Sequence, residues 1–157
     1  MFLEVFSEIV KIEPKAEFIL VGRGGLEDKI KRKVQDMKLV DKVHFLGVRE
    51  DIPELMIMMD GFVFPSIHEG LGIVAVEAQA AGLPCLISSN VTSDVNIGQD
   101  VKMKDLTDGV KDWADSIDSF DYAISREVRC HNNYELITKA GYNIENEANE
   151  LLKIYNS

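Results

Sequence analysis

Basic residues, cysteines and long apolar runs are all scarce in this chain of 157 residues. It carries 17 lysines and arginines against 27 aspartates and glutamates, which gives a formal net charge of −10. A nucleic-acid surface depends on a local excess of basic side chains, so we expect no nucleic-acid partner. The charge balance does not exclude one phosphate-bearing small molecule, because a helix N-terminus binds phosphate with little basic help.

The two cysteines, Cys85 and Cys130, exclude further classes of protein. They form no CxxC pair, no metal-ligand spacing with histidine and no disulfide framework, so we expect two reduced thiols and no metal. The longest apolar runs include Phe18–Val21 and Leu55–Met59, far short of the roughly 20 residues that cross a bilayer. The segment Met1–Phe6 lacks the basic region and cleavage site of a signal peptide, so we expect a cytoplasmic protein.

The chain does contain a regular succession of short apolar strands and helices. We predict strands over residues 17–22, 42–47, 61–64 and 85–87, and a short edge strand over residues 101–103. The predicted helices cover residues 2–12, 26–37, 52–59, 71–81, 107–117, 125–140 and 143–157. Strands that are apolar throughout and alternate with helices are typical of a parallel sheet covered on both faces. We therefore expect a single α/β domain over residues 1–157, with a Rossmann-like, doubly wound parallel sheet.

The order of the first elements is unusual, because a doubly wound domain normally opens with a strand and this chain opens on a helix. Either the domain is atypical or its first strand is not in this chain. The turn at Gly22–Gly25 does not supply a dinucleotide site, since the G-x-G-x-x-G pattern would require glycine where Glu27 stands. We expect this turn to have no direct ligand, although its backbone allows close approach.

Gly47, Val48 and Arg49 end the second predicted strand. The carboxyl ends of strands face the ligand crevice in open α/β sheets, so this segment could border a nucleobase. An exposed Arg49 that pairs with Glu50 or Asp51 is an equally good interpretation.

Candidate site residues are densest where the third predicted strand leads into a helix. His68 and Glu69 fall at the carboxyl end of the strand, and Gly70 and Gly72 leave the backbone open to a ligand. The helix N-terminus that follows offers N–H groups and positive partial charge to an anion. A ligand that is part phosphate and part sugar would suit this arrangement.

Glu77 lies in a very apolar part of the same predicted helix. A carboxylate in such surroundings needs a partner, because unpaired buried charge is costly. A salt bridge or cap within the fold would satisfy it. Two adjacent hydroxyls of a ribose would satisfy it equally well.

Five motifs occur together in this chain: Val21-Gly22, Phe45-Leu46-Gly47, Phe62–Ser66, Glu69–Gly72 and Glu77–Pro84. Their order and spacing resemble the retaining, nucleotide-sugar-dependent glycosyltransferases of the GT-B fold, whose E-x7-E signature Glu69 and Glu77 match. Residues 1–90 resemble the family well and the C-terminal third loosely. The ending at residues 141–144 with its Glu/Lys-rich helix is similar to members that build capsular polysaccharide or exopolysaccharide.

The resemblance implies a role for each residue of the site. Glu69 would be the catalytic residue and would contact hydroxyls of a sugar donated from UDP or GDP. The amides of Gly70–Gly72 would meet the diphosphate, Glu77 the ribose hydroxyls, and Gly47–Arg49 the base. The implied binding positions are Gly47, Val48, Arg49, His68, Gly70, Leu71, Gly72, Ile73, Val74 and Glu77. The acceptor would be a polysaccharide or a lipid-linked sugar, the configuration would be retained, and no metal would be needed.

The chain departs from this family in length. Members have two Rossmann-like domains with the active site between them, and this chain resembles only the C-terminal, donor-binding one. It lacks the first strand and the following loop, where the family carries a basic pair facing the diphosphate. We expect a fragment with little or no activity alone, whose N-terminal domain is missing. The complete enzyme would be cytoplasmic, with peripheral association at the inner membrane surface.

The missing strand has a structural consequence. In the family's sheet order it lies centrally, between the strands at residues 17–21 and 61–64. Either these two strands pair directly, or an apolar edge is left for another chain to cover. We predict a homo-oligomer formed through an exposed or swapped strand.

Other functions remain open at this point. A binding-only or regulatory module would keep the nucleotide crevice without chemistry. A GT-B-like sugar-nucleotide epimerase shares the architecture, but its catalytic acids and histidines come from both halves, and the Glu69–Glu77 motif favours transfer. A receiver-type domain is least supported, since no phosphoacceptor aspartate ends an early strand.

Overall fold

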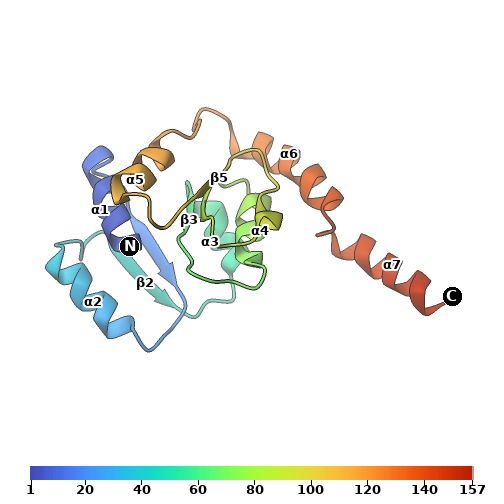
Figure 1. The fold of residues 1–157 in the computed structure, drawn as a ribbon, viewed down its shortest axis with the longest axis horizontal. Helices are drawn as coiled ribbons and strands as arrows, with labels where there is room; N and C mark the ends of the chain where they lie inside the picture. Colours follow the sequence, from blue (N-terminus) through green and yellow to red (C-terminus); the bar gives the residue numbers. More distant parts are fainter. Residues whose placement is uncertain (157) are drawn as a thin grey trace.

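A computed structural model describes residues 1–156 of the chain (Figure 1). Its helices are α1 (Phe2–Ile12), α2 (Glu27–Asp36), α3 (Ile52–Met58), α4 (Ile73–Ala80), α5 (Val110–Asp118), α6 (Arg126–Lys139) and α7 (Ile144–Tyr155), with a short 3-10 helix η1 (Ser93–Val95). Its strands are β1 (Phe18–Val21), β2 (Val43–Gly47), β3 (Phe62–Phe64), β4 (Cys85–Ser88) and β5 (Val101–Lys104). The helix expected over residues 143–157 is α7, and Ser157 lies outside the described residues.

Two helices begin more than one residue later than the sequence pattern predicts. α4 starts at Ile73 because Gly72 adopts a left-handed conformation, with φ 74°, and so lies outside the helix. α5 starts at Val110 because the preceding residues form a turn, in which the Asp105 carboxylate accepts hydrogen bonds from the backbone N–H and the hydroxyl of Thr107, both at 2.7 Å. Side-chain acceptors of this kind compete with helix formation.

All strand pairs are parallel, as predicted, but they form two separate sheets. One sheet has the order β1-β2 and the other β3-β4-β5, with β5 at an edge as expected. Of the two arrangements expected for β1 and β3, direct pairing is therefore wrong. Among the described residues, 1–156, each of these strands has one edge without a neighbouring strand.

The central strand β4 is covered by helices on both faces. Leu86 packs with Val5 of α1 and Trp113 of α5, whereas Cys85 and Ile87 face a cluster that includes helix α4. This alternation is the period-two pattern of a strand buried on both sides. It gives the β3-β4-β5 sheet the doubly wound arrangement.

The two sheets are connected through the helices on one face. α1 and α5 lie side by side (Figure 1), and α1 contributes Leu3 and Phe6 to the core of the β1-β2 sheet. Its Val5 enters the Trp113 cluster of the other sheet. A single helix thus fills parts of two cores.

The C-terminal helices differ in their packing. α6 packs on α4, while α7 extends away from the body of the molecule (Figure 1) and buries none of its residues. Within residues 1–156, every helix is too short or too polar to cross a membrane.

Candidate functional site

The site is built where β3 and β4 end side by side. Phe64 pairs with Ile87, so the loop after β3 and the loop after β4 leave the sheet at the same edge. The first of these loops carries His68, Glu69 and Gly70, and then enters α4. The structure therefore places Glu69, the glycines that follow it and the start of α4 one after another at the carboxyl ends of the strands, as the sequence predicts.

The N-terminus of α4 is free of side-chain caps. Gly72 is its N-cap residue, no side chain of residues 1–156 makes a capping hydrogen bond there, and no acidic residue occupies the first turn. The first N–H groups of a helix have no partner inside the helix, so this terminus can receive an anion. Gly72 is buried, and an added Cβ would lie 3.0 Å from Cγ1 of Val91, so only glycine fits this backbone.

The residues around the helix start are accessible. A Cβ at Gly70 would meet nothing within 4 Å, and Leu71 and Ile73 are 39% and 49% exposed. His68 is exposed, and Val74 is half-buried against the core. The backbone of this turn can therefore be approached from solvent.

Glu69 is partly buried and held by a neighbour. The Ser66 hydroxyl donates a hydrogen bond of 2.7 Å to Oε1 of Glu69. The second oxygen of the carboxylate makes no hydrogen bond or ion pair within residues 1–156. Ser66 was not among the residues singled out from the sequence.

Glu77 is exposed, so the expectation of a buried carboxylate that needs a partner is wrong. Within residues 1–156 its carboxylate has no ion pair or hydrogen bond, which leaves the salt-bridge alternative without support. The cause is helix phase, because Ile73, Glu77 and Ala80 follow at helical spacing along the one exposed face of α4. The small, apolar residues around Glu77 in the sequence face other directions.

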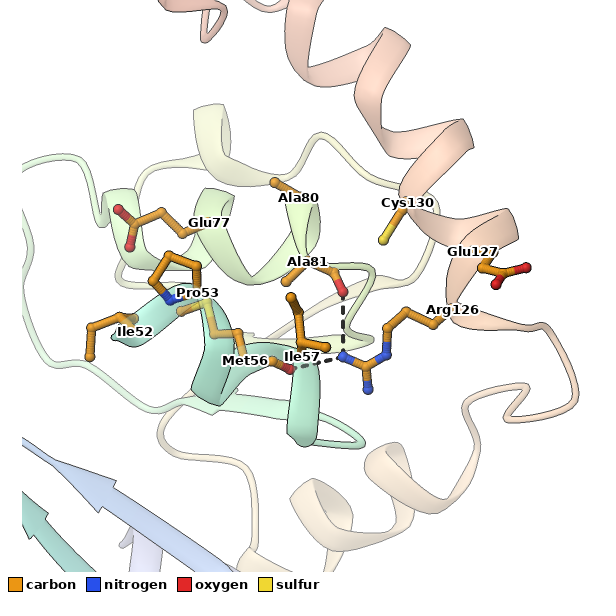
Figure 2. Close-up of a pocket in the computed structure, with 10 residues that line it drawn as sticks. All are labelled: Ile52, Pro53, Met56, Ile57, Glu77, Ala80, Ala81, Arg126, Glu127 and Cys130. Atoms are coloured by element: carbon orange, nitrogen blue, oxygen red, sulfur yellow. Dashed lines mark hydrogen bonds between the residues drawn. The ribbon is translucent and has the colours of Figure 1, made fainter. Parts of the chain in front are cut away.

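A groove of about 720 Å³ runs between α3, α4 and α6 (Figure 2). Its lining residues are Ile52, Pro53, Met56, Ile57, Glu77, Ala80, Ala81, Arg126, Glu127 and Cys130. Glu77 lies at one end, near Pro53, and Arg126 projects from α6 at the other (Figure 2). Glu77 thus borders this groove, one helical turn after Ile73 at the start of α4.

Arg49 makes a bidentate ion pair with Asp51. Its Nε donates to Oδ1 at 2.7 Å, and its Nη2 donates to Oδ2. The guanidinium lowers the pKa of the Asp51 carboxyl and the carboxylate raises the pKa of Arg49. Of the two interpretations of Arg49, the structure thus shows the exposed arginine that pairs with a neighbouring carboxylate. Val48 beside it is 66% exposed.

The glycine turn after β1 lies beside the end of β2. The Gly22 N–H donates to the Gly47 carbonyl at 2.7 Å, and a Cβ on Gly47 would lie 3.8 Å from Nε of Arg23. Gly47, with φ 65°, is thus placed at the carboxyl edge next to a basic residue that sequence patterns did not single out. Within residues 1–156, no three histidine, cysteine or acidic side chains gather in a way that could hold a metal ion.

Comparison with known proteins assigns the chain to a family. The profile described as "Glycosyl transferases group 1" matches residues 1–146. The chain is 36% identical over 141 residues to the glycosyltransferase EpsF of Bacillus subtilis, which covers 89% of the chain and 36% of EpsF. It is 38% identical over 128 residues, 80% of the chain and 32% of the relative, to UDP-Gal:alpha-D-GlcNAc-diphosphoundecaprenol alpha-1,3-galactosyltransferase of Escherichia coli. The chain spans about a third of the length of these relatives.

Solved structures agree on the fold. HepE of Anabaena, crystallised in complex with UDP and glucose, matches with a TM-score of 0.79 at 21% identity, covering 98% of this chain and 44% of HepE. The predicted Rossmann-like architecture, one half of a GT-B fold, is confirmed by this likeness. The resemblance noted from the sequence motifs is confirmed as well, and the chain belongs to the group 1 glycosyl transferases.

Proposed function

We propose that this chain is the donor-binding part of a retaining glycosyltransferase that uses a UDP- or GDP-sugar. One observation carries the proposal: the uncapped N-terminus of α4 and the carboxylate of Glu69 share the carboxyl edge of β3. An uncapped helix terminus suits the diphosphate, because its free N–H groups and positive end stabilise negative charge. A carboxylate beside it accepts hydrogen bonds from the hydroxyls of the attached sugar.

The leaving diphosphate would be bound without a metal. The amides at Gly70–Gly72 and the start of α4 would take over part of the charge stabilisation that a cation supplies elsewhere. His68, Ile73 and Val74 would border the phosphates. Glu69 would act as the catalytic residue through its contact with the donor sugar.

The nucleoside would lie along the outer face of α4. Glu77 supports this role because its exposed carboxylate has two free oxygens, which match the two adjacent hydroxyls of a ribose. Val48 presents exposed apolar surface at the end of β2 that could pack against a base. Gly47 and Arg49 would flank that base.

The acceptor in this proposal is a polysaccharide or a lipid-linked sugar. The Escherichia coli relative is named for a diphosphoundecaprenol substrate, which supports a lipid-linked acceptor. A lipid-linked acceptor would hold the complete enzyme at a membrane surface. Because the chain spans about a third of such relatives, an N-terminal domain would supply the acceptor site, and the chain alone would transfer little or no sugar.

Calorimetric titration of the chain with UDP, GDP and ADP tests the proposal. We expect UDP or GDP to bind, and Glu77→Ala to weaken that binding by about tenfold, which corresponds to the loss of hydrogen bonds to a charged group. Glu135→Ala removes an exposed carboxylate on α6 and serves as the control. The proposal is wrong if no nucleotide binds, or if Glu77→Ala affects binding no more than the control does.

We also propose that the open edges of β1 and β3 are covered by a strand from a second copy. Phe18 and Phe62 donate their N–H groups to Lys42 and Pro84, in or beside the neighbouring strands. Alternation along a strand then turns the N–H groups of Ile19 and Val63 away from those neighbours. Apolar edges of this kind favour pairing with another chain.

A further inference from the structure

The loop that carries Glu69 has little backbone support of its own. Within residues 1–156, the backbone of residues 66–71 makes no hydrogen bond to another backbone group. Ile67 in its middle is 79% exposed, so core packing does not hold it either. The conformation of this loop therefore depends on side chains that bond to it.

Ser66 supplies the first of these bonds. Its hydroxyl lies 2.7 Å from Oε1 of Glu69 and 3.4 Å from the carbonyl oxygen of His68, and it has only one proton, which it donates to the nearer, charged oxygen of Glu69. The short bond to a carboxylate restricts the Glu69 side chain, and Oε2 is left without a hydrogen bond within residues 1–156. Ser66 thus determines which way Glu69 presents its charge.

Asn90 supplies the second bond from the loop after β4. Its Nδ2 donates to the carbonyl oxygen of Ile67 at 3.2 Å. Asn90 is itself anchored, because its own N–H donates to Oγ of the fully buried Ser88 at 3.2 Å. The next residue, Val91, is buried and packs against Gly72 at the start of α4.

We propose that Ser66 and Asn90 are positioning residues that hold Glu69 in place for the donor sugar. This inference rests on the proposed function and deepens it. Ser66 bonds to the Glu69 side chain and Asn90 to the Ile67 carbonyl. The groups assigned to the nucleoside are on α4 and at the end of β2, and the diphosphate is assigned to the start of α4 as well as to the loop at residues 68–72. Loss of either side chain should therefore weaken binding of the sugar moiety more than binding of the nucleoside diphosphate.

The test is a paired titration of the chain with a nucleoside diphosphate and with its sugar nucleotide. UDP is compared with UDP-glucose, UDP-galactose and UDP-N-acetylglucosamine, and GDP with GDP-mannose. The sugar nucleotide that binds the unmodified chain most tightly is then used with the variants. We expect Ser66→Ala to lower the affinity for the sugar nucleotide by about tenfold and to lower the nucleoside diphosphate affinity by much less. Asn90→Ala should act in the same direction, and Ser66→Thr should retain affinity because it keeps the hydroxyl.

Ser116→Ala is the matched control, since it removes a hydroxyl that bonds to the Asp112 carbonyl within α5. Thermal unfolding of each variant checks that it is folded. Equal loss of both ligands in Ser66→Ala, or no loss of either, overturns this inference and leaves the proposed function standing. Failure of the unmodified chain to bind any nucleotide or sugar nucleotide overturns the proposed function and the inference with it.

Discussion

Arg126 of α6 donates a hydrogen bond from Nη1 to the backbone oxygen of Met56 in α3, at 2.8 Å and across 70 residues of chain. The same guanidinium donates to the carbonyl oxygens of Met59 and Ala81, just beyond the ends of α3 and α4 (Figure 2 shows the bonds to Met56 and Ala81). The last carbonyls of a helix have no partner inside it and carry negative partial charge, so a cation stabilises them. The Arg126 side chain thus links α6 by hydrogen bonds to the ends of α3 and α4, the other two helices that border the groove.

Replacing Arg126 by leucine should therefore destabilise the fold. The change leaves carbonyls at two helix ends without their donor, and we expect the free energy of unfolding to fall by about 3 kcal/mol. Urea denaturation followed by circular dichroism measures this. Lys139→Leu removes a positive charge from the exposed end of the same helix and should change stability by less than about 0.5 kcal/mol. Equal effects of the two substitutions would contradict the assigned role.

Gly82 should not tolerate a side chain. Its φ is +72°, and an added Cβ would lie 2.7 Å from Sγ of Cys130 and 2.9 Å from the carbonyl oxygen of Arg126. Backbone strain and overpacking together predict that Gly82→Ala lowers the free energy of unfolding by about 3 kcal/mol. Gly24→Ala is the control, because a Cβ there meets nothing within 4 Å. A Gly82→Ala protein as stable as the Gly24→Ala protein would refute this packing.

Glu4 should make stability depend on pH in the acid range. A hydrogen bond from Lys33, and next the amino group of Met1, lower the pKa of Glu4 from 4.5 to about 2. Because the folded pKa is the lower one, the stabilisation is present above pH 4.5 and is lost as pH falls towards 2. Glu4 is 37% exposed, so solvent screening limits the effect to less than about 1 kcal/mol.

Urea denaturation at several pH values between 4.5 and 2 measures this effect, by comparing the unmodified chain with Glu4→Gln. The difference in stability between the two proteins should shrink as the pH falls, and high salt should reduce it at every pH. A difference that stays constant over this range would rule out the ion pair as its source.

The open edges of β1 and β3 predict self-association. Multi-angle light scattering over a range of concentrations should detect a dimer or larger oligomer. Val21→Lys places a charge on the β1 edge strand, where Val21 is 39% exposed, and should shift the population towards monomer, because charged edge residues oppose strand pairing. Val40→Lys is a surface control, as Val40 is 57% exposed and lies between α2 and β2. A protein that stays monomeric at high concentration would show that these edges are not used in this way.

Local patterns account for most of the secondary structure. The apolar tetrapeptide Phe18–Val21 forms β1 where strand propensity predicts it. Leu3 and Phe6, three residues apart on the predicted helix over residues 2–12, pack in the core of the β1-β2 sheet. The start of α5 differs, because the hydrogen bonds of Asp105 compete with the helix. Such bonds depend on the position of a turn, which composition does not reveal.

The residues of the site that are close together in the sequence could be predicted. Glu69, Gly72 and the start of α4 succeed one another along a single strand-loop-helix segment, so a sequence pattern can locate them. Asn90 is 23 residues from its partner Ile67 and belongs to a different loop. Nothing in the local sequence signals that hydrogen bond, since it arises only when β3 and β4 lie side by side.

The sequence by itself determined the alternation of parallel strands and helices, the family motifs and the position of Glu69 before a helix start. Tertiary structure alone decided which face of α4 is buried and leaves Glu77 exposed, that Asn90 bonds to Ile67, and that β1 and β3 remain apart. The physical reason is the distance along the chain over which each interaction acts. Hydrophobic period and turn chemistry act over a few residues, whereas burial and pairing depend on which segments meet across the fold.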